Sequence, residues 1–289
     1  MIFIIKNNLN LSLEQMHYIL NNKRKYIPQK LYRYRAINSN EPIEDNKHID
    51  ALKKDKIYLT NPYYFNDPYD SAFSIDMELF KNILIKNAER QIKENIIKLE
   101  LEKGNKDINQ FENIEDIYDY INVDLSKADP FFNMNLPFFY DEIIKQIKFK
   151  ISCFCKNHNS ILMWSHYANQ HQGFCIEYNT SKIEEKILEK IYPVFYHETF
   201  FPLIETGTLN DKKFNSLIKY KDWKYEHEWR LISDEKFLSL KPSKIYLGVR
   251  FNDEYLDLFK DIAREKNCEL YQMEMNYSKY ALKNKEIKL

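Results

Sequence analysis

The sequence predicts an α+β fold with a mixed sheet, built from strand-helix-strand units and interrupted by a helical insertion. Three observations support this prediction. Short apolar or alternating runs that suit strands recur beside segments of helical periodicity, helical patterns dominate the region from about 77 to 147, and 44% of the 289 residues are hydrophobic, which is ample for a core. We expect a single α+β domain over 1–289, with the helical insertion at about 77–147.

The first strand-helix-strand unit is predicted near the N-terminus. In the strand expected at 31–35, Arg33 and Arg35 share one face and two tyrosines share the other, because side chains alternate along a strand. A short helix at 48–52 and a strand at 56–60 follow, and a turn-rich loop comes after them.

Two further strand-helix-strand units are predicted after the insertion. Ser160 is a suitable N-cap for the first of their helices, and Gly173 supplies the backbone freedom needed to enter the next strand. The second unit comprises a strand at 148–156, a helix at 161–168 and a strand at 174–178; the third comprises a strand at 244–251, a helix at 254–266 and a strand at 269–275.

Charge and hydropathy narrow the functional classes. Lys plus Arg (43) equals Asp plus Glu (43), so no summed field draws the chain onto nucleic acid or an anionic membrane. The apolar runs are far shorter than the ~20 residues needed to cross a bilayer. Asparagines interrupt the apolar N-terminus before a secretory signal is complete. We therefore expect a cytoplasmic protein without a membrane partner.

The four cysteines are predicted to be reduced core thiols. A zinc site is the alternative, because Cys153 and Cys155 would point to one face of a strand and Cys175 on a neighbouring strand would bring a third thiol close. The spacing differs from the usual Cys-x-x-Cys, however, and His166 and His171 are five residues apart rather than four. No metal is expected.

The first candidate site is the run of aromatic and polar residues at 163–173. Trp164, Tyr167 and His171 would line a pocket for a planar or sugar-bearing ligand, and His166 lies on another face of the helix as a candidate catalytic residue. In the alternative interpretation, the tryptophan packs in the core and the histidines satisfy buried carbonyl groups.

The second candidate site is the cluster at 223–230. If this segment is extended, Glu226, Glu228 and Arg230 share one face, so two carboxylates and a guanidinium converge. Paired carboxylates can raise one another's pKa or divide the roles of base and hydrogen-bond acceptor, which makes both glutamates candidate catalytic residues. The alternative is a ladder of ion pairs at the surface.

The third candidate is the loop at 65–70, which contains Asn66 and Asp67. Its two aspartates and asparagine would grip a ligand hydroxyl or a neighbouring arginine. Ordinary turn chemistry explains the same residues without any function.

Together these motifs resemble the domain of unknown function 2971 family, and they occur in the order that the family shows. The resemblance implies a bacterial protein that accompanies phage-defence and toxin systems. The helical insertion is longer than the family leads us to expect. The motifs are 31–35, 65–70, 163–168 with His171 and Gly173, 174–177, and 223–230.

The layout also resembles that of an ADP-ribosyltransferase, although the Ser-Thr-Ser stretch of that class is absent. This resemblance implies that Arg33 or Arg35 holds the pyrophosphate or the nicotinamide ribose of NAD. It implies that Tyr167 or a nearby tryptophan stacks on nicotinamide. It further implies that Glu226 or Glu228 accepts the ribose 2′-hydroxyl and stabilises the charge that develops as the glycosidic bond breaks.

Two functional hypotheses follow. The first is an NAD-using, ADP-ribosyltransferase-like enzyme or NAD glycohydrolase, with NAD as substrate. It would act as a toxin or effector of bacterial anti-phage defence, with a protein or a nucleic acid as its possible target. The second is a non-catalytic sensor that binds a nucleotide, nucleic acid or a phage protein. The candidate catalytic residues are Glu226, Glu228 and His166, and the candidate ligand-binding residues are Arg33, Arg35, Asn66, Asp67, Trp164, Tyr167, His171 and Arg230.

Overall fold

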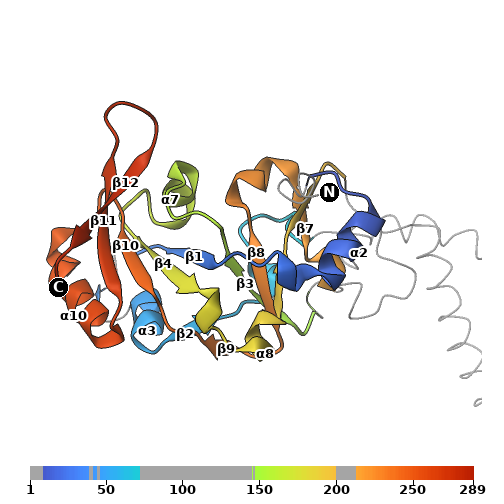
Figure 1. The fold of residues 1–289 in the computed structure, drawn as a ribbon, viewed down its shortest axis with the longest axis horizontal. Helices are drawn as coiled ribbons and strands as arrows, with labels where there is room; N and C mark the ends of the chain where they lie inside the picture. The colour runs from blue at the N-terminus through green and yellow to red at the C-terminus, as the bar shows by residue number, and fades with distance from the viewer. Residues whose placement is uncertain (1–8, 39–41, 44–45, 72–144, 146, 200–212) are drawn as a thin grey trace, which may run out of the picture. The chain divides into compact units, whose positions relative to one another are not determined.

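The computed structural model describes residues 9–38, 42–43, 46–71, 145, 147–199 and 213–289. The chain divides into two compact units, one formed by 1–72, 147–200 and 212–289, the other by 73–146 and 201–211. The described helices and strands lie in the first unit and form an α+β fold (Figure 1). The helical insertion predicted at about 77–147 falls outside the described residues, apart from positions 145 and 147.

The largest sheet in the described part of the chain has five strands. In spatial order they are β1 (Lys30–Arg35), β4 (Phe174–Asn179), β10 (Lys244–Leu247), β11 (Glu269–Met275) and β12 (Leu282–Ile287). All neighbours pair antiparallel except β10 and β11, which are parallel. Strand β1 is therefore the edge strand nearest to the rest of the fold, and a bridge between Tyr32 and Cys155 links it to β3.

Three smaller sheets are formed by the remaining described strands. The first contains β3 (Lys150–Phe154), β8 (Trp229–Ser233) and β5 (Ile191–Pro193) in that order; the second pairs β2 (Lys56–Tyr58) with β9 (Phe237–Ser239); the third pairs β6 (Phe195–His197) with β7 (Ile218–Tyr220). Because β3 and β8 stand beside the β1 edge, residues from two sheets reach the same space (Figure 1).

Side-chain caps fix the starts of the helices that matter for the site. The Ser160 hydroxyl accepts a hydrogen bond from the Met163 amide, as an N-cap should, and Asn46 caps α3 in the same way. The described α-helices are α2 (Leu13–Asn21), α3 (Lys47–Lys53), α7 (Ile161–Tyr167), α8 (Glu185–Leu188) and α10 (Leu256–Lys266). Short 3-10 helices are η1 (Lys23–Lys25), η3 (Pro62–Tyr64), η6 (Thr180–Lys182), η7 (Lys221–Glu226) and η8 (Asp253–Tyr255).

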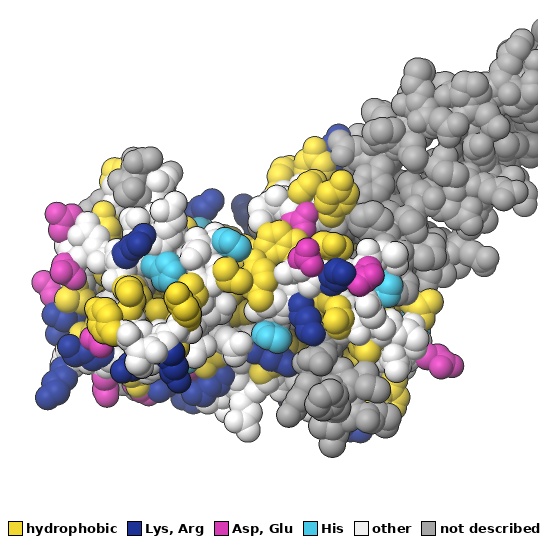
Figure 2. All heavy atoms as spheres, turned by 90° about the horizontal axis from the view of Figure 1, so that it is seen from above, with side chains coloured by type: hydrophobic (Ala, Val, Ile, Leu, Met, Phe, Trp, Pro, Cys, Tyr) yellow, Lys and Arg dark blue, Asp and Glu magenta, His cyan; other side chains and the backbone are white. Residues whose placement is uncertain are grey.

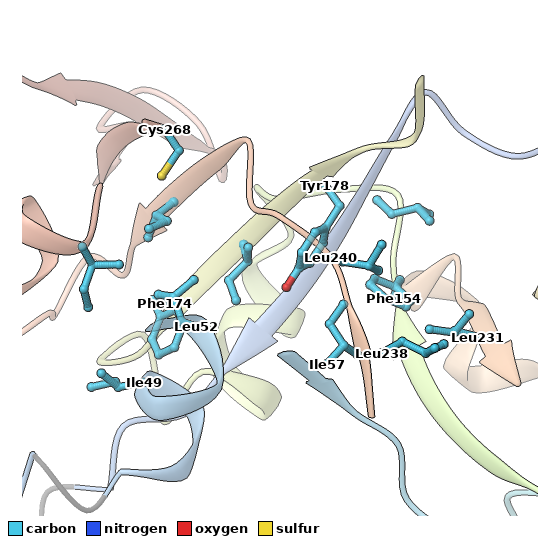
Figure 3. Close-up of a cluster of buried hydrophobic side chains, with 14 of the residues drawn as sticks. Ile49, Leu52, Ile57, Phe154, Phe174, Tyr178, Leu231, Leu238, Leu240 and Cys268 are labelled. Atoms are coloured by element: carbon cyan, nitrogen blue, oxygen red, sulfur yellow. The ribbon is translucent and has the colours of Figure 1, made fainter. Parts of the chain in front are cut away.

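Hydrophobic clusters cover both faces of the five-stranded sheet. On one face, Ile49 and Leu52 of α3 pack with Phe174 and Tyr178 of β4, close to Leu238 of β9 (Figure 3). On the other face, α7 contributes its own buried residues to a second cluster, which also contains both tyrosines of β1. The alternation of β1 thus divides its side chains between two cores, as the sequence predicts.

The predicted elements agree with the structure, but their pairing differs. Only the third unit is a strand-helix-strand unit with adjacent parallel strands, β10 and β11 around α10. The two strands of the first unit, β1 and β2, lie in different sheets, as do β3 and β4 of the second. Local pattern marks a strand without naming its partner, because partners come from distant parts of the chain. The described elements that were not predicted include the helices α2 and α8 and the strands β5, β6, β7, β9 and β12.

Gly173 has a different role from the one predicted. A Cβ atom at this position would lie 2.1 Å from the Arg35 carbonyl oxygen, far inside van der Waals contact. Glycine is therefore required by the close approach of β1, not by an unusual backbone conformation. The neighbouring turn carries the conformational strain instead, since Asn169, Gln170 and His171 all have positive φ.

Candidate functional site

A cleft of about 540 Å³ opens beside the edge strand β1. This volume lies within the range of roughly 300–1,000 Å³ that is typical of small-molecule sites. Residues of β1, α3, β3, α7 and the 219–228 segment line it. Among them are the predicted site residues Arg33, Arg35, Asn66, His166, Tyr167, Glu226 and Glu228.

The edge position of β1 explains how these residues meet. Arg33 shares a face of the strand with Leu31, which packs in the cluster of α3. Tyr167 packs against the opposite cluster, that of α7. β1 is an edge strand of the five-stranded sheet, and groups from the two sides of that sheet line one cleft beside it.

One face of the described residues carries no dominant charge. On the face seen in Figure 2, basic, acidic, histidine and hydrophobic side chains of the described residues lie intermingled. This distribution matches the net charge of zero. Ligand choice therefore depends on the groups inside the cleft rather than on an overall field.

The acidic floor of the cleft has a backbone that the sequence did not predict. Instead of one extended segment, η7 ends at Glu226, His227 is left-handed with φ 45° and ψ 51°, and β8 begins at Trp229. Glu226, Glu228 and Arg230 still converge, because the left-handed residue turns the chain between helix and strand. They are buried, which rules out the surface ion-pair ladder.

Arg230 is the centre of this floor and contacts no open space. Its side chain is 0% exposed. The guanidinium donates through Nε and Nη2 to both carboxylate oxygens of Glu228, at 2.7 and 3.2 Å, and through Nη2 to Asp70 at 2.7 Å. Nη1 donates to the Ser71 hydroxyl and the Ser216 carbonyl oxygen. All five N–H donors of the arginine are thus used inside the protein. Arg230 therefore holds the floor together and has no donor left for the ligand-binding role that the sequence predicted.

Lys219 joins the two glutamates. Its Nζ lies 2.6 Å from Glu226 Oε2, 3.0 Å from Glu228 Oε2 and 3.5 Å from Asp70 Oδ2. Burial opposes its charge, but the three carboxylates outweigh burial and raise the pKa of Lys219 well above its ordinary value. The side chain therefore stays an ammonium ion and is not a nucleophile.

Of the two glutamates in the cleft, Glu226 has the pKa closer to neutral pH. Burial raises its pKa to about 7, and the negative charge of Glu228 adds to the effect. The cluster explains why: three carboxylates (Asp70, Glu226, Glu228) share two cations (Lys219, Arg230), so one negative charge is uncompensated. Lys219 lowers this pKa through its charge and its hydrogen bond, and the Tyr167 hydroxyl, which donates to Glu226 Oε1, lowers it further, so both partly offset the rise.

Glu228 behaves in the opposite way. Burial opposes its ionisation, but Arg230 and then Lys219 outweigh burial and hold the pKa of Glu228 well below its ordinary value. Two neighbouring carboxylates are therefore driven apart in pKa, the pattern by which acid and base roles are divided in many active sites. Glu228 stays ionised, whereas Glu226 can exchange a proton near neutral pH.

The positive wall of the cleft is formed by Arg33 and Arg35, with His48 of α3 beside them. Arg33 Nη2 donates to the Tyr58 carbonyl oxygen at 2.9 Å, and its Nε is buried without a partner among the described residues. Burial lowers the pKa of Arg33 to about 10, so the group remains protonated at neutral pH. It faces the cleft as a cation with unused donors.

The predicted aromatic and histidine residues are divided between cleft and core. Trp164 is 0% exposed and donates through Nε1 to the His158 carbonyl oxygen, so it packs in the core as in the alternative interpretation. His171 lies outside this cleft and pairs with the Ser165 hydroxyl at 3.1 Å. His166 lines the cleft and is exposed, with its Nδ1 2.8 Å from the Tyr225 hydroxyl.

The loop at 65–70 serves structure and site at once. Asn66 lines the cleft, whereas Asp67 lines a different hollow and accepts a hydrogen bond from the Tyr69 amide at 2.9 Å in an ordinary turn. Asp70 contacts Arg230, which is the arginine-gripping role considered for this loop.

All four cysteines are free thiols, and Cys153 and Cys155 line the cleft. Burial raises the pKa of Cys153, Cys155 and Cys175, so they stay protonated and poorly reactive. Within the described ranges, no group of three or more His, Cys, Asp or Glu side chains is placed to hold a metal ion.

Sequence reasoning missed Lys219 and His48. A lysine between apolar residues on a short strand gives no local sign that it will be buried under three carboxylates. His48 was assigned only to a helix, and its place in the cleft depends on how α3 packs beside β1.

The structure is that of an α+β protein with a cleft lined by charged residues at the edge of its largest described sheet. Residues 163–231 match the model of a family described as protein of unknown function (DUF2971), in agreement with the resemblance found in the sequence. The matched segment begins in α7, ends in β8 and includes both glutamates of the cleft. No curated protein and no solved structure matches the chain.

A search of the described helices for a membrane-spanning segment gave none that combines sufficient length with sufficient apolar character.

Proposed function

We propose that the cleft binds NAD or an NAD-like dinucleotide and cleaves the bond between its ribose and nicotinamide, as an NAD glycohydrolase or an ADP-ribosyltransferase. One observation carries the proposal: a carboxylate pair with divided pKa values, Glu226 and Glu228, lines the same cleft as the Arg33 cation with unused donors. An anionic ligand with a reactive glycosidic bond satisfies both ends of such a cleft.

The proposed reaction assigns a separate role to each end. The bond between ribose C1′ and the nicotinamide nitrogen breaks, and its electron pair leaves with nicotinamide, which departs as a neutral molecule. Water, or a hydroxyl group of an acceptor, adds to the resulting cationic C1′ and loses a proton. Glu226 accepts this proton, since its pKa of about 7 suits a base at neutral pH.

The remaining cleft residues position the substrate in this scheme. The uncompensated negative charge of the floor favours the positive charge that develops on the ribose. The ring of Tyr167 is available to the nicotinamide, whereas Trp164 is sealed in the core. Arg33 and Arg35 hold the phosphates. Arg230 and Lys219 keep the two carboxylates in place.

The direct test is release of nicotinamide from NAD by the purified chain, followed by chromatography, together with transfer of labelled ADP-ribose to a bacterial lysate. Glu226→Gln should lower the rate by at least about 100-fold, because a positioned base contributes about 10²–10⁴-fold. Glu235→Gln is the matched control, since Glu235 forms an exposed pair with Lys190 away from the cleft. Folded wild-type protein that neither consumes NAD nor labels any target would end the proposal.

A second candidate is a nucleotide sensor without catalysis. It is favoured by the fact that both oxygens of Glu226 already accept hydrogen bonds, from Tyr167 and Lys219. A sensor predicts that Glu226→Gln leaves nucleotide binding and biological activity intact, while Arg33→Met weakens binding. The enzyme hypothesis predicts instead that Glu226→Gln reduces biological activity more than Arg33→Met does.

We extend the proposal to the cell through the family resemblance: the chain acts as an effector of bacterial anti-phage defence by consuming NAD. Induced expression should then lower cellular NAD and arrest growth, and Glu226→Gln should do neither at equal protein level. If wild type and Glu226→Gln both arrest growth, the arrest does not depend on the proposed reaction.

A further inference from the structure

Arg33 is a cation without a counter-ion in the described part of the chain. Among the described residues, the Tyr58 carbonyl oxygen is the one acceptor for its five N–H donors. No described carboxylate forms an ion pair with it, and the Phe154 ring lies 5.9 Å from its Cζ. A desolvated charge of this kind is unfavourable in the folded protein unless a ligand supplies the opposite charge.

His48 stands next to this cation on the same cleft. Its backbone amide is bound by the Asn46 cap of α3, which fixes the residue at the start of the helix. Burial, then the charge of Arg33, then that of Lys47, lower the pKa of His48 to about 4. The imidazole is therefore neutral at neutral pH, and no described residue accepts or donates a hydrogen bond to its ring.

The shape of the two groups favours a tetrahedral oxyanion. A guanidinium binds two oxygens of one anion side by side, and an imidazole N–H requires a third oxygen nearby. A phosphate has that third oxygen, whereas a carboxylate does not.

We propose that Arg33 and His48 together bind one phosphate group of the ligand, and that His48 takes up a proton as this phosphate binds. The identity of the phosphate as part of the NAD diphosphate rests on the proposed function. The binding site itself rests on the unpaired guanidinium and the adjacent imidazole.

The expected proton uptake by His48 follows from the charges that act on it. The described charges that act on His48 are both positive, Arg33 from β1 and Lys47 from its own helix. A bound phosphate adds a negative charge, which favours the imidazolium form. Diphosphate diesters do not titrate near neutral pH, so the added proton must reside on the protein. Binding is then tighter at low pH and weakens as the pH rises through the higher pKa of His48 in the complex.

Sulfate is the appropriate probe, because it is a tetrahedral dianion that does not titrate between pH 5 and 8. Isothermal titration calorimetry of the full chain at pH 5, 6 and 7, in two buffers of different ionisation enthalpy, measures both affinity and proton uptake. The affinity of wild type should fall by about tenfold or more from pH 5 to 7, as a shift of one pKa unit changes binding by about tenfold.

Glu226 must be controlled in this experiment, because it titrates in the same range and its ionisation also weakens anion binding. All measurements are therefore repeated in the Glu226→Gln background. There, His48→Gln should keep sulfate binding but abolish the pH dependence and the proton uptake. Arg33→Met should reduce binding at least about tenfold at every pH, and Arg33→Lys should reduce it less.

Arg264→Met is the matched control for the loss of one arginine, since Arg264 forms an exposed pair with Asp261 on α10. It should bind sulfate as wild type does. A thermal melt confirms that each variant is folded. The proposal is overturned if wild type does not bind sulfate, if acetate binds as tightly, or if the pH dependence survives His48→Gln.

These results separate the phosphate site from the proposed reaction. Sulfate binding that depends on Arg33, with a pH dependence that is lost in His48→Gln, retains the site and removes the reaction if the protein does not consume NAD. NAD consumption that is unaffected by both Arg33→Met and His48→Gln retains the reaction and removes the site.

Discussion

Arg33 lines the wall of the cleft and Arg230 is buried beneath its floor, and the two arginines differ in how the protein uses their hydrogen-bond donors. Arg230, beneath the floor, uses all five of its N–H donors on Glu228, Asp70, Ser71 and Ser216. Arg33, on the wall, uses one. Asp70 and Glu228 outweigh burial and raise the pKa of Arg230 well above its ordinary value, whereas burial lowers that of Arg33 to about 10.

The contrast distinguishes an arginine that stabilises the fold, Arg230, from one that keeps donors free for a ligand, Arg33. A guanidinium whose donors are all bound inside the protein fixes its partners and leaves nothing for a ligand. A guanidinium held in place by one backbone oxygen retains its charge and most of its donors. The sequence predicted a ligand-binding role for both arginines. Their hydrogen bonds in the structure assign them different roles.

The largest expected effect comes from Arg230→Met. It leaves Glu228 and Asp70 buried without their cation, so the free energy of unfolding should fall by about 3–5 kcal/mol in urea denaturation. Arg264→Met, in an exposed ion pair, should change it by less than about 1 kcal/mol. Equal effects from the two variants would contradict the scaffold role.

The next effect concerns pH. The pKa of Glu226 in the folded protein, about 7, lies above its ordinary value of 4.5, so the folded state binds this proton more tightly than the unfolded state. Its contribution to stability is complete below pH 4.5 and is lost as the pH rises through 7, by up to about 3 kcal/mol. Thermal melts of wild type should decline over this range, and those of Glu226→Gln should decline less. If the melting temperatures of wild type and Glu226→Gln fall in parallel with pH, the pKa of Glu226 is not raised by its neighbours as described.

A smaller effect is expected from Tyr167→Phe. The lost hydroxyl no longer donates to the ionised form of Glu226, so the pKa of Glu226 should rise further. The free energy of unfolding at pH 8 should fall by about 1 kcal/mol, as for a typical hydrogen bond. Carboxyl titration followed by infrared or NMR spectroscopy measures the shift directly. A lower pKa in the variant would reverse the assignment of donor and acceptor.

The smallest effect on stability is expected from Arg33→Met, and its sign is informative. Removal of a desolvated charge without a counter-ion should leave the melting temperature unchanged or raise it slightly, by no more than about 1 kcal/mol of stability. A loss of several kcal/mol, as expected for Arg230, would make Arg33 a second scaffold arginine and erase the contrast.

Much of the local structure follows from the sequence. The alternation around Arg33 predicted β1, and the Ser160 cap with the periodicity after it predicted α7. The convergence of Glu226, Glu228 and Arg230 was also predicted, but for the wrong reason. Extended alternation was assumed, whereas a left-handed His227 joins a 3-10 helix to β8. Alternation and helix termination can bring the same side chains together, and periodicity does not distinguish them over so few residues.

The sequence by itself determined a part of the helices and strands, among them β1, α7 and α10, because caps and alternation are local properties. It also determined that charged and aromatic residues would be available near Tyr167 and the two glutamates. Only the tertiary structure decided that Lys219 lies under three carboxylates, that Trp164 is sealed in the core, and that Arg33 faces the cleft unpaired. Burial and charge pairing arise between distant segments, and these two quantities set the pKa values on which any chemistry of this cleft depends.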